Sequence, residues 1–134
     1  MPKVVFEIDG EAFDSLEGFF AAISEAMGTA PYGRNLDSLN DVLRGGFGTP
    51  DAGFVLCWRS SELSRVRLGY PETIARLERL LQTCHPANRD RIGEELARAR
   101  RHEGPTVFDQ LVELLRDHGP GGEEADSGVE LELL

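Results

Sequence analysis

Two aspartates, Asp37 and Asp41, stand four residues apart in a stretch whose pattern predicts a short helix. Residues at this spacing are neighbours on a helix surface, where like charges repel each other and destabilise the isolated helix. Such a carboxylate pair can accept bidentate hydrogen bonds from arginine. The pair therefore favours binding to a basic partner surface. The alternative is an ordinary solvated helix face, with Asp37 interacting with the helix dipole.

The helix that carries the two aspartates has residues at both ends that commonly begin and end helices. Asn35 is a good N-cap, because its side-chain oxygen accepts from the free N–H groups of the first turn. Gly45 and Gly46 end the pattern a few residues later. The predicted apolar face consists of three leucines at helical spacing: Leu36, Leu39 and Leu43.

The rest of the chain predicts three strands separated by helices. The strands are predicted over 4–9, 54–58 and 129–134, and the unbroken apolar run of the second is typical of burial on both faces. The helices are predicted over 16–27, 61–68, 71–84, 89–99 and 106–118. The first of these helices begins with capping-box spacing from Asp14 to Glu17. Strands separated by helices pair in parallel, so the fold class is α/β.

The predicted architecture is a three-layer α/β/α-type fold, in which helices pack a three-stranded parallel sheet. A chain of 134 residues is expected to form one domain, here residues 1–134. We expect 69–105 to form a helical insertion on this body. The Gly- and Glu-rich stretch 119–128 is expected to be a flexible loop.

The charge of the chain is acidic and unevenly distributed. The formal net charge is −10, but residues 59–101 contain ten basic and six acidic residues, a local +4. The remainder therefore carries −14, which is −10 minus +4. An acidic body argues against binding a nucleic-acid backbone, because phosphate contacts need lysine and arginine. It favours a basic partner, although acidity can also serve solubility alone.

The stretch around the two aspartates resembles the barstar family of intracellular ribonuclease inhibitors. The matching pattern is Tyr32-Gly33, Asn35-Leu36-Asp37, Leu39, Asp41 and Leu43, on a loop and helix after a first strand and helix. The apolar run ending in Trp58-Arg59 looks like the second strand of the family, and the chain also closes on a strand. The resemblance covers residues 3–68 and 106–134, and it implies the same three-stranded fold.

The resemblance implies that the acidic helix enters the active site of a ribonuclease. The carboxylates of this helix would bind the basic groups of the nuclease that otherwise bind RNA phosphate. Asp41 would have the central role in this contact and Asp37 a supporting one. Tyr32 and Gly33 match a loop of the family that contacts the nuclease. The alternative is that the Tyr32 ring packs under the loop and that Gly33 is only a turn residue. The residues expected to bind the partner are Tyr32, Gly33, Asn35, Asp37, Asn40, Asp41, Arg44, Phe47 and Asp117.

Several of these positions depart from the pattern of the best-known family members. Pro31 replaces one aromatic residue, and Asn40 and Gly46 replace tryptophans. Aromatic anchors carry much interface energy, so their absence suggests a different or smaller target surface. Phe47 is placed to compensate for Gly46, whereas Arg44 would repel a basic cleft unless it points away or meets an acidic rim. Asp117 matches a peripheral acidic contact, and its alternative is plain surface charge.

The sequence shows no motif for catalysis, and no metal or cofactor is expected. Two carboxylates could form an acid–base pair, but four residues apart on an exposed helix they have no cleft. No apolar run is long enough to cross a bilayer, and the expected location is the cytoplasm. The expected partner is a basic ribonuclease, bound 1:1, with no membrane, small-molecule substrate or direct nucleic-acid contact. The alternative function is a non-inhibitory protein-interaction module that uses the Arg-rich insertion.

Overall fold

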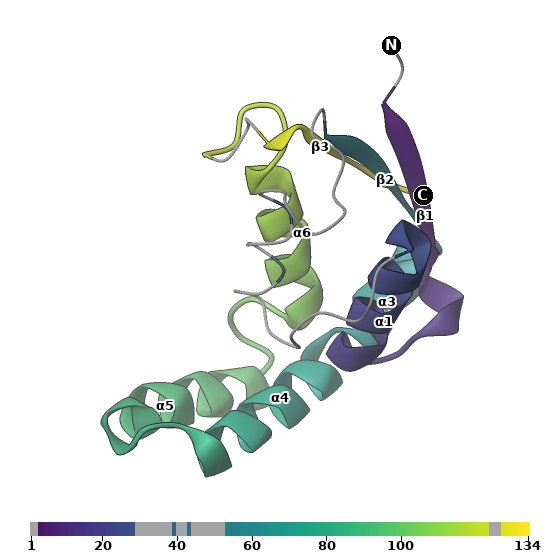
Figure 1. Ribbon diagram of the computed structural model, residues 1–134. Helices are drawn as coiled ribbons and strands as arrows, with labels where there is room; N and C mark the ends of the chain where they lie inside the picture. The colour runs from purple at the N-terminus through teal and green to yellow at the C-terminus, as the bar shows by residue number, and fades with distance from the viewer. Residues whose placement is uncertain (1–2, 29–38, 40–42, 44–52, 124–126) are drawn as a thin grey trace.

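A three-stranded parallel sheet forms the centre of the computed structural model, which describes residues 3–28, 39, 43, 53–123 and 127–134. Its strands are β1 (Val4–Asp9), β2 (Phe54–Arg59) and β3 (Val129–Leu133), in the order β1-β2-β3 (Figure 1). Both pairings are parallel. The predicted α/β class, the parallel sheet and the central position of the second strand are therefore confirmed.

The helices lie close to where apolar periodicity predicts them. They are α1 (Leu16–Met27), α3 (Ser61–Arg67), α4 (Tyr70–Thr83), α5 (Arg89–Arg100) and α6 (Val107–Asp117), with short 3-10 turns at Gly10–Ala12 and Pro86–Asn88. The predicted bounds of α1 are confirmed, but its predicted N-cap was wrong by one residue. Ser15 is its N-cap, and the Ser15 hydroxyl accepts from the Gly18 N–H at 3.0 Å, so Asp14 does not cap the helix.

The main core fills the space between one face of the sheet and the helices α1 and α6. Trp58 at the end of β2 is fully buried, and its ring centroid lies 5.1 Å from that of Phe19 on α1 and 5.2 Å from that of Phe108 on α6. The Trp58 indole N–H donates to the Ser64 hydroxyl on α3 at 2.9 Å. One residue thus joins the central strand to three helices.

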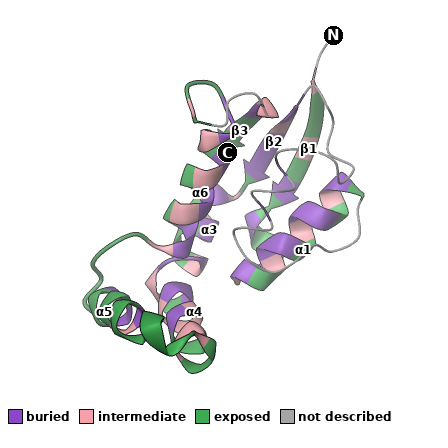
Figure 2. Ribbon diagram, turned by 60° about the vertical axis from the view of Figure 1, so that its left-hand side comes forward, coloured by how far each residue is buried: buried purple, intermediate pink, exposed green. Residues whose placement is uncertain are grey.

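The opposite face of the sheet is not covered by any helix among the described residues. Val5 is 55% exposed, and Glu7, Glu130 and Glu132 are also exposed there. The described residues thus form two layers, and the third layer of the predicted α/β/α arrangement is not found among them (Figure 2). Cys57 is nevertheless buried on this face, because neighbouring strand side chains such as Glu132 cover it.

The helices α4 and α5 form a hairpin that extends away from the sheet (Figures 1 and 2). The hairpin has its own apolar cluster, formed by Leu77, Ile92, Leu96 and Ala99. It is tied to the body at the start of α4. There the Glu72 carboxylate accepts from the Leu16 N–H at 2.9 Å, and the Thr73 hydroxyl accepts from the Val107 N–H at 2.9 Å. Two residues of α4 thus satisfy first-turn N–H groups of α1 and α6.

The chain between α6 and β3 is held at both of its ends. His118 is fully buried, and its Nδ1 atom lies 2.8 Å from the Ser127 hydroxyl. The Val129 N–H donates to the His118 carbonyl at 2.8 Å, which places the start of β3 beside the end of α6. Residues 124–126, within the stretch predicted to be a flexible loop, lie outside the described residues.

We expect Glu72→Ala to lower the free energy of unfolding by about 1–3 kcal/mol, because it leaves the buried Leu16 N–H without an acceptor. Urea denaturation followed by the fluorescence of Trp58, the only tryptophan, measures the change. The matched control is Glu78→Ala on the same helix, which removes an exposed ion pair with Arg100 and should change stability by less than about 0.5 kcal/mol. Equal losses in the two variants would contradict the capping role of Glu72.

Candidate functional site

Most of the predicted partner-binding residues lie outside the described residues. This holds for Tyr32, Gly33, Asn35, Asp37, Asn40, Asp41, Arg44 and Phe47. Within the same stretch the structure describes Leu39 and Leu43, and it also describes Asp117. These three residues therefore connect the sequence prediction to the observed fold.

Leu39 and Leu43 are helical, and both side chains are buried in the main core, with exposures of 0% and 1%. They belong to the same apolar cluster as Trp58 and the core residues of α1 and α6. Their four-residue spacing is that of one helix face. The helical state and the core-facing role predicted for these two leucines are therefore confirmed.

Asp117 is the last residue of α6. This helix is fixed by a capping box at its start and by buried side chains along its length. At its start, the Thr106 hydroxyl accepts from the Asp109 N–H, and the Asp109 carboxylate accepts from the Thr106 N–H. This reciprocal pair is a capping box. Along the helix, Phe108, Leu111 and Leu115 are buried in the core. Asp117 itself is partly buried, on a helix that the core holds in place.

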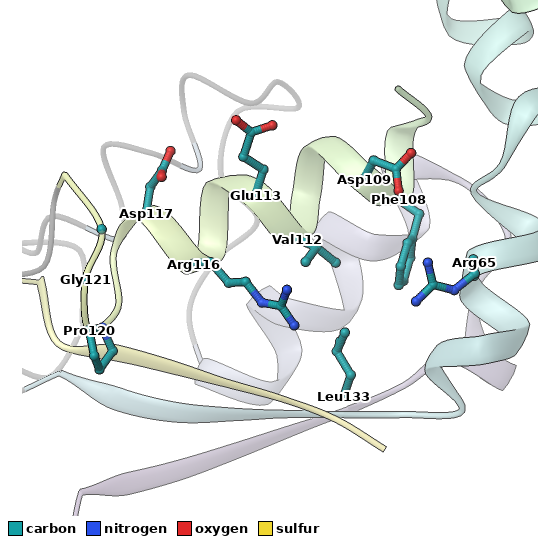
Figure 3. Close-up of a pocket in the computed structure, with 11 residues that line it drawn as sticks. Arg65, Phe108, Asp109, Val112, Glu113, Arg116, Asp117, Pro120, Gly121 and Leu133 are labelled. Atoms are coloured by element: carbon teal, nitrogen blue, oxygen red, sulfur yellow. The ribbon is translucent and has the colours of Figure 1, made fainter. Parts of the chain in front are cut away.

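Asp117 is the end of a row of three acidic side chains along α6, which we call the acidic stripe. It consists of Asp109, Glu113 and Asp117, spaced four residues apart, and Figure 3 shows the three carboxylates on one side of the helix. Sequence analysis singled out only Asp117. The four-residue spacing that drew attention to Asp37 and Asp41 would also have identified Glu113, whereas the helix cap that engages Asp109 needed the structure.

Four of the seven arginines in 69–105 form ion pairs with glutamates of the same segment. The ion pairs are Arg79–Glu72, Arg91–Glu95, Arg100–Glu78 and Arg101–Glu103, at 3.3–3.5 Å. Residues 69–105 contain seven basic and six acidic residues, which leaves a net charge of only +1. This pairing weakens the alternative interpretation in which the hairpin is a strongly basic binding surface.

The two cysteines are free thiols in different surroundings. Cys57 is buried on the sheet and Cys84 is partly buried at the end of α4. Burial raises the pKa of the Cys57 thiol, and so does its hydrogen bond to Glu132, at 3.4 Å. Among the described residues, no group of three or more His, Cys, Asp or Glu side chains could hold a metal ion. The raised pKa keeps the Cys57 thiol protonated, so Cys57 is not an activated nucleophile.

No helix in the described part of the chain combines the length and the apolar character needed to cross a membrane.

A comparison with family models finds one whose description is Barstar (barnase inhibitor), and it matches residues 3–110. The matched range includes 69–105 and ends before β3, whereas the sequence analysis set 69–105 apart and included 106–134. A comparison with curated proteins finds no match.

We expect Leu43→Ala to lower the free energy of unfolding by about 2–5 kcal/mol, because it leaves a cavity in the main core. The same substitution at Leu134, whose side chain is 60% exposed, is the control and should cost less than about 0.5 kcal/mol. Urea denaturation followed by tryptophan fluorescence compares the two variants. Similar midpoints would mean that Leu43 does not anchor its segment to the core.

Proposed function

The chain belongs to the barstar family, and on that premise we propose that it is a proteinaceous inhibitor of a ribonuclease. The observation that carries the proposal is the family match, which extends over 108 of the 134 residues (3–110). The net charge of −10 supports it, because a ribonuclease must be basic where it grips RNA phosphate. Members of this family are inhibitors and not enzymes, so the proposed action is binding without a chemical step.

In the proposed complex, carboxylates take the place of RNA phosphates. Asp41 has the central role in accepting hydrogen bonds from catalytic arginine or lysine, and Asp37 supports it from one turn earlier. A rigid helix is suited to this, because a carboxylate that is already positioned loses little entropy on binding. The surrounding contacts are proposed to come from Tyr32, Gly33, Asn35, Asn40, Arg44 and Phe47.

We further propose that the acidic stripe of α6 takes part in binding. Glu113 and Asp117 are proposed as rim contacts, because charges at a rim contribute more to the rate of association than to final affinity. The complex is proposed to be 1:1 and to need no cofactor, membrane or nucleic acid. In the cytoplasm, such a complex would protect the producing cell from its own ribonuclease or from that of a competitor.

We expect Asp41→Ala to weaken ribonuclease binding by about 30-fold or more, because it leaves a basic group of the enzyme buried without a partner. The control is Glu123→Ala, an exposed residue after α6, which should change affinity by less than about twofold. Inhibition constants against barnase, the ribonuclease that the family description names, provide the first measurement. If the chain does not inhibit barnase, a pull-down with the wild-type chain is used to identify the ribonuclease that it binds.

Equal effects of Asp41→Ala and Glu123→Ala on the identified ribonuclease would show that the assigned face is wrong. Capture of a partner that is not a ribonuclease, together with no inhibition of barnase, would contradict the inhibitor function itself. The two outcomes are distinct, because the first concerns the position of the binding face and the second concerns the class of the partner.

Removing Glu113 and Asp117 from the acidic stripe is expected to slow association and leave dissociation almost unchanged. The double variant Glu113→Ala with Asp117→Ala should reduce the association rate constant about two- to fivefold at low salt, because it weakens the attraction of a basic enzyme. Asp90→Ala with Glu94→Ala removes the same charge at the same spacing from exposed positions of α5 and is the matched control. Stopped-flow measurements at two ionic strengths test the difference. Equal slowing in both double variants would mean that only net charge matters.

A further inference from the structure

The strand β1 lies at one end of the sheet, and its outer edge has no hydrogen-bonding partner among the described residues. The Phe54 N–H donates to the Gly128 carbonyl, so the backbone of Phe54 faces β3 and that of its neighbour Val55 faces β1. Val55 is in register with Val5. In a parallel ladder, Val55 then bonds to the residues on either side of Val5. The N–H and the carbonyl of Val5 itself therefore point outward, away from β2.

The free edge of β1 carries exposed apolar side chains on both faces of the sheet. Backbone direction repeats every second residue, so Lys3 and Glu7 also point their N–H and carbonyl groups outward. Val5 is 55% exposed on the open face, and Val4, on the core-facing side, is 48% exposed. An edge strand with exposed apolar residues and free backbone groups is a template for pairing with another chain.

Residues 3–7 are complementary to themselves when a second copy runs antiparallel to the first. With Val5 opposite Val5 of the second copy, Val4 lies opposite Phe6 and Lys3 lies opposite Glu7. The symmetry of the pair repeats the last two contacts. Opposed residues share a face, so the open face has one apolar pair between two pairs of opposite charge, and the core-facing side has two apolar pairs. Cross-strand pairs of both kinds stabilise a sheet.

We propose that two copies of this chain pair along their β1 edges, antiparallel and related by a two-fold axis at Val5. The two three-stranded sheets then form one continuous sheet. The outward N–H and carbonyl groups of Val5 would bond to those of Val5 in the second copy, and the groups of Lys3 would bond to those of Glu7. The second copy is favoured as the occupant because the edge is complementary to itself in charge and in apolar character.

Other registers of the same antiparallel pairing are less favourable. An axis at Phe6 places the apolar Val5 opposite the charged Glu7, and an axis at Val4 places Val5 opposite Lys3. An axis at Glu7 places two carboxylates opposite each other, which is destabilising. The axis at Val5 thus avoids a charged side chain opposite an apolar or like-charged one throughout residues 3–7.

The other end of the sheet is protected against the same kind of pairing. If β3 paired with β3 of a second copy about Leu131, Glu130 would lie opposite Glu132, and both side chains are exposed. Charged residues on an edge strand are a known device against self-association. The two edges of the sheet therefore differ, and self-pairing is expected at β1 alone.

Pairing at β1 leaves the acidic stripe accessible in each copy. The helix α6 packs against β3 and α1 packs against β1, so the acidic stripe lies at the end of the sheet away from the proposed contact (Figure 2). The inference goes beyond ribonuclease inhibition and does not depend on it. A dimer of this kind would present two acidic stripes.

Lys3 is the residue whose present contacts must change in the dimer. Its ammonium group donates to the Gly128 carbonyl at 2.9 Å and pairs with Glu130 at 3.5 Å, on the other side of β2. The Glu130 side chain is 47% exposed, and exposed ion pairs contribute little to stability. The Gly128 carbonyl keeps its bond from the Phe54 N–H. Exchanging Glu130 for Glu7 of the second copy therefore costs little, and the new charge pair mainly selects the register.

The first test measures the oligomeric state by sedimentation velocity from about 1 μM to about 1 mM protein. The wild-type chain should show a monomer–dimer equilibrium in the micromolar range, because so short a contact buries less surface than a standard interface. Val5→Lys places two lysines opposite each other at the axis and should raise the dimer dissociation constant by about tenfold or more. Val66→Lys makes the same change at a 70% exposed position of α3 and should leave the constant unchanged.

The second test exchanges the charges to examine the register. Lys3→Glu and Glu7→Lys each place like charges opposite each other, so each variant alone should dimerise more weakly than the wild type. In an equimolar mixture, the glutamate introduced in one variant lies opposite the lysine introduced in the other, and native Glu7 lies opposite native Lys3. The mixture should therefore form a heterodimer although both variants remain net negative. Lysine and glutamate contacts elsewhere on the surface would not produce this rescue.

The proposal is overturned if the wild-type chain stays monomeric at the highest concentration or forms open-ended assemblies larger than a dimer. Equal dimerisation of Val5→Lys and Val66→Lys, or no rescue in the mixture, also overturns it. Thermal unfolding verifies that each variant is folded, and if Val5→Lys is not, the charge variants decide. Ribonuclease inhibition by Val5→Lys should match that of the wild type. Failure of the dimer test leaves the inhibitor proposal intact, and failure of the inhibition test leaves the dimer proposal intact.

Discussion

The burial of Trp58 is the constraint on which the rest of the structure depends. The indole lies at the end of the central strand, where it contacts aromatic rings of α1 and α6 and donates its N–H to Ser64 of α3. Its full burial requires all three helices to lie on one face of the sheet. The long connections between parallel strands must therefore carry these helices to that face, and the acidic stripe of α6 is placed by the same packing.

The described helices all pack on one face of the sheet. Among the described residues the opposite face carries exposed charged side chains, and there Lys3 donates to the Gly128 carbonyl at 2.9 Å and pairs with Glu130 at 3.5 Å. The strand β3 lies at one end of the sheet with α6 beside it.

The fold was predictable because its signals are local. The period-two pattern of 129–134 and the helical spacing of Phe108, Leu111 and Leu115 each belong to one element and need no knowledge of its neighbours. The capping prediction at Asp14 failed by one residue because Ser15, which also accepts hydrogen bonds well, stands next to it. The three-layer expectation treated the apolar run of β2 as burial under helices, whereas carboxylate side chains of neighbouring strands cover Cys57.

The sequence by itself determined the elements, the acidic character of the chain and its resemblance to the barstar family, because composition, periodicity and motif spacing are properties of the linear chain. Only the tertiary structure decided which charges neutralise each other, such as Arg100 with Glu78 across the hairpin. It also decided that Leu39 and Leu43 share a core with Trp58 and that β3 lies at one end of the sheet. The physical reason is that ion pairing, core membership and strand position depend on distances between residues far apart in sequence, which no local pattern encodes.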